Sequence, residues 1–196
     1  MPGENLTRVE ALTRSSHITV KSYDIEIDVR EASSSPTYRS ISTIKFVAEG
    51  TKETFVDAIA TTVHSVTLNG EELDPKEVFA DSRIALTSLK SENTLTVHAD
   101  FAYMNTGEGL HRFVDPVDNE VYLYSEFEVP DSRRVFAVFE QPDLKATFRF
   151  VVRAPEAWQV ISNQPGVQTH SIDGATWRFT PTPRVSSYIT ALIAGP

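Results

Sequence analysis

Glu126 and Glu128, at the end of residues 120–128, offer the most distinctive chemistry in this sequence. Apolar and polar residues alternate there, so a strand would place alternate side chains on one face. That face would carry Tyr122, Tyr124, Glu126 and Glu128. Carboxylates two residues apart on a strand lie about 7 Å apart, and aromatic rings beside them add a cation–π attraction. The pattern predicts a seat for a cation, with a solvated strand face whose tyrosines pack by their rings as the alternative.

The next stretch, residues 131–143, combines paired arginines with acids. Arg133 and Arg134 are adjacent, and three acidic residues accompany them. The acids are Asp131, Glu140 and Asp143. This composition predicts a salt-bridge network that holds a turn. Residues 131–139, with Pro130 just ahead of them, are also the best candidate for a short helix.

Motifs for several other chemistries are missing. The histidines are His17, His64, His98, His111 and His170. No two are three or four residues apart and no His-Glu-x-x-His occurs, so a zinc site on one helix is absent. The sequence has no Gly-x-Ser-x-Gly, no P-loop and no cysteine. Gly107-Glu108-Gly109 lacks the third glycine and the following helix of a dinucleotide site, and we expect a flexible loop or bulge there.

The elements that must position these residues are strands. Tyr23, Ile25, Ile27 and Val29 alternate with polar residues, as in a half-buried strand. Asn69-Gly70 predicts a hairpin, because this pair favours positive φ at two successive positions. No window of twelve residues keeps an apolar stripe at helical spacing, so the pattern predicts an all-β sandwich or layered sheet. We expect a polar segment over residues 1–16, loose or with one short helical turn, and a single β-rich domain over residues 17–196.

Composition limits the partners. The 196 residues carry a formal net charge of −9 with no cluster of Lys or Arg, which argues against nucleic acid and against anionic membrane surfaces. No run approaches the roughly 20 apolar residues of a membrane-spanning helix, and no apolar core of a signal peptide is present. The lack of cysteine suits a reducing compartment, so we expect a cytoplasmic location.

Residues 125–148 resemble a segment of a known protein family. They read SEFEVPDSRRVFAVFEQPDLKATF, and this segment resembles the signature of the N-terminal domain of the aminopeptidase N family of zinc peptidases. Residues 1–11 and 22–29 resemble the start of bacterial, actinobacterial-like members, Gly109–Phe113 resembles the Gly-Leu-x-Arg segment, and residues 179–195 resemble the closing strand. The resemblance implies a saddle-like domain of layered antiparallel or mixed sheets. The catalytic domain, with its Gly-x-Met-Glu-Asn and His-Glu-x-x-His motifs, would follow, so we expect this chain to be a fragment.

The resemblance also implies roles for the two glutamates. In the family, a Thr-Gln-x-Glu-like stretch helps to hold the free α-amino group of the substrate. Glu126 takes the place of the Gln and Glu128 that of the Glu, while Ser125 replaces the Thr. The expected function is removal of N-terminal amino acids from peptides by the parent enzyme, with this domain packed on its own catalytic domain. Zinc would be bound by that missing domain and none by this chain, which alone should be inactive.

Two other functions compete with this one. A β-sandwich that binds carbohydrate or protein could stack Trp158 or Trp177 on a sugar ring, although both lie within predicted strands and suit a core. A purely structural, adhesion-type sandwich would need no catalytic partner. If a catalytic domain does cover this one, we expect an exposed apolar patch around Tyr122, Tyr124 and residues 133–143.

Overall fold

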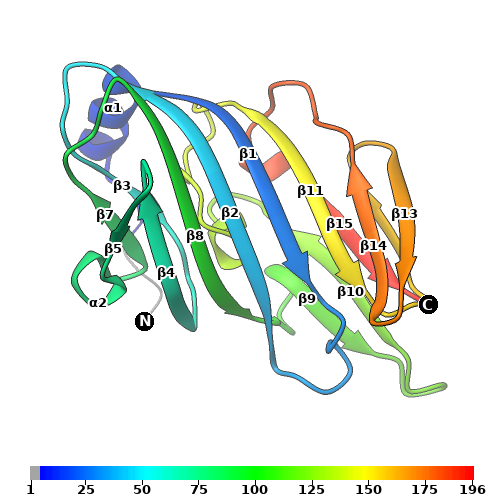
Figure 1. Ribbon diagram of the computed structural model, residues 1–196. Helices are drawn as coiled ribbons and strands as arrows, with labels where there is room; N and C mark the ends of the chain where they lie inside the picture. The colour runs from blue at the N-terminus through cyan, green and yellow to red at the C-terminus, as the bar shows by residue number, and fades with distance from the viewer. Residues whose placement is uncertain (1–4) are drawn as a thin grey trace.

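Strands build most of the molecule in this computed structural model, which describes residues 5–196. An eight-stranded sheet has the order β13-β14-β11-β1-β2-β8-β4-β5 (Figure 1). Its strands are β1 (Ile18–Asp28), β2 (Thr37–Ala48), β4 (Thr62–Leu68), β5 (Glu71–Leu73), β8 (Glu92–Ala102), β11 (Thr147–Ala154), β13 (Gly166–Ser171) and β14 (Gly174–Phe179). β1 and β11 run parallel and the other neighbours run antiparallel, so the sheet is mixed.

Two smaller antiparallel sheets accompany the large one. The first has the order β12-β15-β10-β9 and the second the order β3-β7-β6. Their strands are β12 (Gln159–Ser162), β15 (Leu192–Gly195), β10 (Val121–Glu126), β9 (Gly109–Val114), β3 (Thr54–Asp57), β7 (Arg83–Leu86) and β6 (Phe79–Ala80). In Figure 1, β9, β10 and β15 lie behind the large sheet, whereas β3 and β7 lie beside α1. The prediction of an all-β domain with layered sheets is confirmed.

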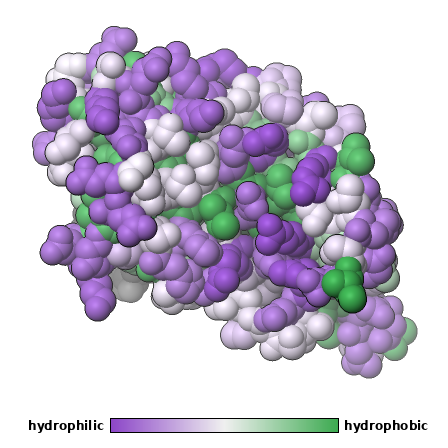
Figure 2. Space-filling model, viewed as in Figure 1, coloured by the Kyte–Doolittle hydropathy of each residue, from purple (hydrophilic) through white to green (hydrophobic). Residues whose placement is uncertain are grey.

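The large sheet separates a charged face from the core. Along β1 the residues Tyr23, Ile25 and Ile27 are each 1% exposed and point inward. Asp24, between two of them, accepts a hydrogen bond of 2.6 Å from Arg149 of β11 on the opposite face. Figure 2 shows that outer face, largely hydrophilic over the strands of the large sheet. The period-two pattern of Tyr23, Ile25, Ile27 and Val29 is therefore realised as predicted, with Val29 just beyond β1 and also buried.

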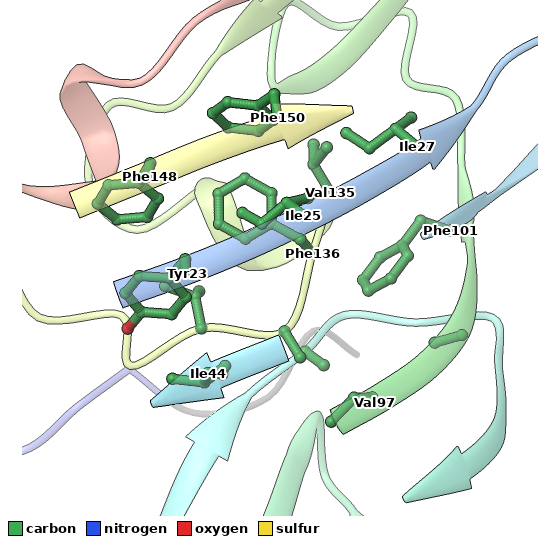
Figure 3. Close-up of a cluster of buried hydrophobic side chains, with 14 of the residues drawn as sticks. Tyr23, Ile25, Ile27, Ile44, Val97, Phe101, Val135, Phe136, Phe148 and Phe150 are labelled. Carbon is green, nitrogen blue, oxygen red and sulfur yellow. The ribbon is translucent and has the colours of Figure 1, made fainter. Parts of the chain in front are cut away.

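Residues 135–141 fill the core below the sheet, in irregular backbone. Figure 3 shows Val135 and Phe136 against Ile25 and Phe150, and the rings of Phe136 and Phe150 meet at 6.0 Å. Only the 3-10 turn η1 (Ser132–Arg134) is helical, so the predicted helix over residues 131–139 is wrong beyond that turn. Residues 135–139 are all 0–1% exposed, and a helix would have turned part of this run toward solvent.

The N-terminal polar segment contributes a regular ten-residue helix, α1 (Arg8–His17), so the expectation of a loose segment or one short helical turn there is wrong. Thr7 and Glu10 form a capping box at its start, which satisfies free backbone donors of the first turn. Arg14 is 3% exposed and its Nη1 lies 3.0 Å from Asp57 Oδ2 in β3. The helix is thus ion-paired to the β-rich part of the chain. Residues 1–4 of the predicted polar segment lie outside the described residues.

Shorter elements complete the chain. The Asn69-Gly70 hairpin is confirmed, with φ of 55° and 86° at these two residues between β4 and β5. A four-residue helix, α2 (Pro75–Val78), follows, capped by Asp74. A 3-10 turn, η2 (Ser187–Ile189), precedes β15. The sequence pattern does not predict strands β3, β6, β9 and β13.

The buried pair of Arg14 and Asp57 gives a first prediction about stability. Arg14→Ala leaves a buried carboxylate without its close partner, and we expect it to lower the free energy of unfolding by about 3 kcal/mol. Arg149→Ala removes a half-exposed partner of Asp24 and should cost less than about 1 kcal/mol. Urea unfolding of the 196-residue chain measures both. Equal costs for the two variants would contradict the assignment of α1 as a structural anchor.

Candidate functional site

The site lies where β10 ends. β10 pairs with β9 on one side and β15 on the other, and Leu192 N donates to Ser125 Oγ at 2.8 Å near its end. Val121 and Leu123 point into the core, whereas Tyr124 and Glu126 are exposed. Paired on both sides, the strand supplies a rigid base for the residues that follow it.

The chain leaves the strand directly after Glu126, so Glu128 is not on the same strand face. Glu126 Oε1 accepts a hydrogen bond of 2.8 Å from Glu128 N, a side-chain contact that replaces strand pairing. Phe127 between them is 2% exposed and packs edge-on against Phe136 at 5.8 Å. The prediction of one continuous strand through Glu128 is therefore wrong, while both glutamates remain exposed. We call residues 126–131 the acidic turn.

Hydrogen bonds fix the far end of the acidic turn. Asp131 N donates to Glu128 O at 3.2 Å. Arg134 Nε donates to Asp131 Oδ1 at 2.6 Å, and Arg134 Nη2 lies 3.1 Å from Glu108 Oε2. The predicted salt-bridge network around the paired arginines is confirmed at Arg134, and it extends to Glu108, which the sequence pattern did not connect to it.

Glu108 belongs to the loop that enters β9, beside the acidic turn. Gly109 lies directly opposite Glu126 in the β9–β10 ladder and has a φ of 61°. Gly107 has a φ of 91°, so both glycines occupy the left-handed region that L side chains rarely adopt. The expectation of a loop is confirmed for residues up to Glu108, and Gly109 starts a strand instead.

An aromatic pair lies on the strand next to the acidic turn. The rings of His111 and Tyr124 stack at 4.6 Å with 20° between their planes. Gly107 N donates to His111 Nδ1 at 3.0 Å, which leaves the proton of a neutral ring on Nε2. Glu126, Glu128 and Glu108 with this ring pair form a negatively charged corner that suits a cation.

The corner has one unpaired acid. Among residues 5–196, no hydrogen bond or ion pair reaches the Glu128 carboxylate, whereas Glu126 holds Glu128 N and Glu108 holds Arg134. The described residues also contain no group of three or more His, Cys, Asp or Glu side chains placed to hold a metal ion. An exposed carboxylate beside two other acids and an aromatic pair can accept hydrogen bonds from an organic cation.

The sequence matches the Peptidase M1 N-terminal domain family over residues 3–189. The chain belongs to this family. This match confirms the family resemblance seen in residues 125–148, and it agrees with the all-β layered fold. The acidic turn lies within residues 125–148, the segment that carries the family resemblance.

Named relatives of this M1 N-terminal domain are aminopeptidases. Aminopeptidase N of Streptomyces lividans is 62% identical over 198 residues, which cover 100% of this chain and 23% of the relative. A probable aminopeptidase 1 of Sulfurisphaera tokodaii is 28% identical over 91% of the chain and 22% of its own length. Aminopeptidase N of Acetobacter pasteurianus is 32% identical over 54% of the chain. The chain spans less than a third of these relatives.

Other expectations for the M1 N-terminal domain fare differently. Residues 133–143 are largely buried, so the predicted apolar patch does not include them. Trp158 is 6% exposed and Trp177 is partly buried against the core, in line with the expectation that both suit a core. No helix within residues 5–196 has the length and hydropathy to cross a membrane, and the expected cytoplasmic location stays a prediction.

The glycines beside the acidic turn give a second prediction. A Cβ on Gly109 would lie 2.9 Å from Arg134 Cβ, whereas a Cβ on Gly107 would meet open space. Gly107→Ala should lower the free energy of unfolding by about 1–2 kcal/mol, from backbone strain alone. Gly109→Ala should lower it by about 1–3 kcal/mol more, because its Cβ also overpacks against Arg134. Urea unfolding compares the two variants, and equal costs would show that the contact of Gly109 with Arg134 does not constrain this corner.

Proposed function

We propose that this domain binds the α-amino group of peptide substrates in a longer zinc aminopeptidase, with Glu128 as the principal acceptor. The observation that carries the proposal is the unpaired, exposed Glu128 carboxylate on a turn whose backbone is hydrogen-bonded on both sides. A substrate ammonium would donate a charge-assisted hydrogen bond to it. Glu126 adds a second negative charge two residues away.

Such binding would set where the peptide is cut. A carboxylate that holds the amino terminus at a fixed place leaves the first peptide bond at a fixed distance from it, and orientation of this kind is a large part of many rate enhancements. Zinc would polarise that bond in the longer protein. Since the described residues offer no metal-binding group, its ligands would come from another part of the polypeptide.

The four-stranded sheet presents a face suited to that other part. Ile161, Ile193 and Tyr124 follow one another across β12, β15 and β10, and they are 59%, 45% and 42% exposed. This apolar row ends at the strand that leads into the acidic turn. Exposed apolar groups in a continuous row are typical of an interface. We propose that the catalytic domain covers the row and so approaches Glu128.

Glu128→Gln in the full-length protein tests the amine-binding role. Leucine hydroxamate and 4-methylpentanehydroxamate differ only by the α-amino group, so the ratio of their dissociation constants isolates amine binding. We expect the variant to raise the dissociation constant of leucine hydroxamate about tenfold or more, as for a lost charged hydrogen bond. The dissociation constant of 4-methylpentanehydroxamate should stay nearly unchanged. Calorimetric titration measures both constants. Glu120→Gln, on the exposed β9–β10 hairpin, is the control, and an unchanged ratio in Glu128→Gln would refute the proposal.

The apolar row has its own test. The 196-residue chain alone should not hydrolyse leucine p-nitroanilide, and mixing it with the separately produced remainder of its polypeptide should restore hydrolysis. Ile193→Asp should weaken the restored activity at a given concentration at least tenfold, because it places a charge in the proposed interface. Val167→Asp, at an exposed position on β13, is the matched control. Equal restoration by both variants would exclude the row as the docking face.

A further inference from the structure

A buried carboxylate, Glu140, gathers three donors beneath the acidic turn. Glu140 is 4% exposed. Its Oε2 accepts the Ser132 hydroxyl and, at 2.8 Å, the backbone N–H of Arg133. Its Oε1 accepts the Ser187 hydroxyl at 2.8 Å. One side chain therefore connects η1, which closes the acidic turn, to η2, which leads into β15.

Arg133 transmits this constraint to the turn itself. The arginine is 5% exposed, and its Nε donates to Pro130 O at 2.9 Å. Its own carbonyl accepts from Ile59 N at 2.6 Å, which fixes the backbone from a third direction. Glu140 thus holds Arg133, and Arg133 holds the carbonyl of Pro130, two residues from Glu128.

The second half of the acidic turn borders a pocket. A cavity of about 360 Å³ is lined by Val129 and Pro130 of the turn together with Arg133 and Glu140. Side chains next to a cavity lack contacts on that side, so packing alone leaves them room to move. On this side of the turn, the polar contacts of Arg133 and Glu140 therefore add a constraint that packing does not supply.

Glu140 is itself anchored from the other side. Its backbone N donates to Asp57 Oδ2 at 3.2 Å, and Asp57 pairs with Arg14 of α1. Burial raises the pKa of Glu140, while the two serine hydroxyls and the Arg133 N–H act in the opposite direction. A buried acceptor with all its donors in place is costly to disturb, because each donor left unpaired loses its hydrogen bond without regaining water.

We propose that Glu140 is a positioning residue for amine binding. Its carboxylate, acting through Ser132 and Arg133, holds the acidic turn in the geometry in which Glu128 accepts the α-ammonium of the substrate. Glu140 touches no substrate, since it is buried below the turn. The inference rests on the proposed function of Glu128 and extends it to a residue twelve positions further along the chain.

Glu140→Gln in the full-length protein tests this role. The variant keeps the shape of the side chain, but it has one acceptor oxygen where the carboxylate has two, so it cannot accept from Ser187 on one side and from Ser132 and Arg133 N on the other at the same time. We expect leucine hydroxamate to bind about tenfold more weakly and 4-methylpentanehydroxamate to change less than about threefold, by calorimetric titration. A smaller folded fraction raises both apparent dissociation constants by the same factor, so a merely structural role would leave the ratio of the two constants unchanged. An unchanged ratio would overturn the proposal.

A serine pair keeps the test decisive if Glu140→Gln does not fold. Ser187→Ala removes one hydroxyl from Glu140, and we expect a smaller shift of the ratio, about two- to fivefold, in the same direction. Ser186→Ala is the matched control, because the equally buried Ser186 hydroxyl donates to Pro142 O instead. Identical ratios of the two dissociation constants in the two serine variants would contradict the positioning role of Glu140.

The reference variant Glu128→Gln separates the two proposals. If Glu128→Gln changes the ratio and the Glu140 and Ser187 variants do not, the positioning role is wrong and amine binding by Glu128 stands. If Glu128→Gln leaves the ratio unchanged, the proposed function fails, and the positioning role fails with it.

Discussion

The structure depends on a small polar network enclosed in an apolar core. Arg14, Asp57 and Glu140 are each 2–4% exposed and come from α1, β3 and the segment below the large sheet. Charges taken out of water are tolerated only when they are paired and hydrogen-bonded. These residues can therefore be satisfied only when the N-terminal helix, the three-stranded sheet and residues 132–140 lie together as they do here. The network makes the position of the acidic turn a consequence of the whole fold.

The acidic turn accommodates Glu126 at a position where the family resemblance leads one to expect glutamine. Glu126 uses Oε1 to accept from Glu128 N, and a glutamine side chain presents an oxygen at the same place. Either residue can close the acidic turn in this way. With glutamate, the corner gains one negative charge and keeps its backbone contact. Glu126 then shapes the turn and adds to its charge, while Glu128 carries the unpaired carboxylate.

Local patterns in the sequence predicted the regular strands well. The alternation around Tyr23 and the Asn69-Gly70 hairpin depend on side-chain periodicity and on backbone φ, which are local properties. The predicted helix over residues 131–139 failed because these residues are buried by partners distant in sequence, such as Tyr23, whose hydroxyl accepts from Phe139 N. When a short segment is buried on all sides, its apolar residues show no period, and the sequence pattern cannot distinguish a helix from a non-helical segment.

The site was predicted in part and for a similar reason. Glu126 and Glu128 were found by alternation and by the resemblance, but their placement on one strand face was wrong because a side-chain hydrogen bond ends the strand. Glu108 was not connected to the site, and Glu140 was predicted only as a member of a salt-bridge network, since the contacts with Arg134, Ser132 and Ser187 exist only in the folded chain. Pairs of donors and acceptors far apart in sequence leave no periodic signal.

A crystal structure of the full-length protein with bound leucine hydroxamate tests the central claim most directly. The account predicts the α-amino nitrogen of the ligand at hydrogen-bond distance, about 3 Å, from a Glu128 carboxylate oxygen, with the Arg133 contact to Pro130 intact. An amino group bound entirely by residues outside this chain, with Glu128 facing solvent, would contradict it.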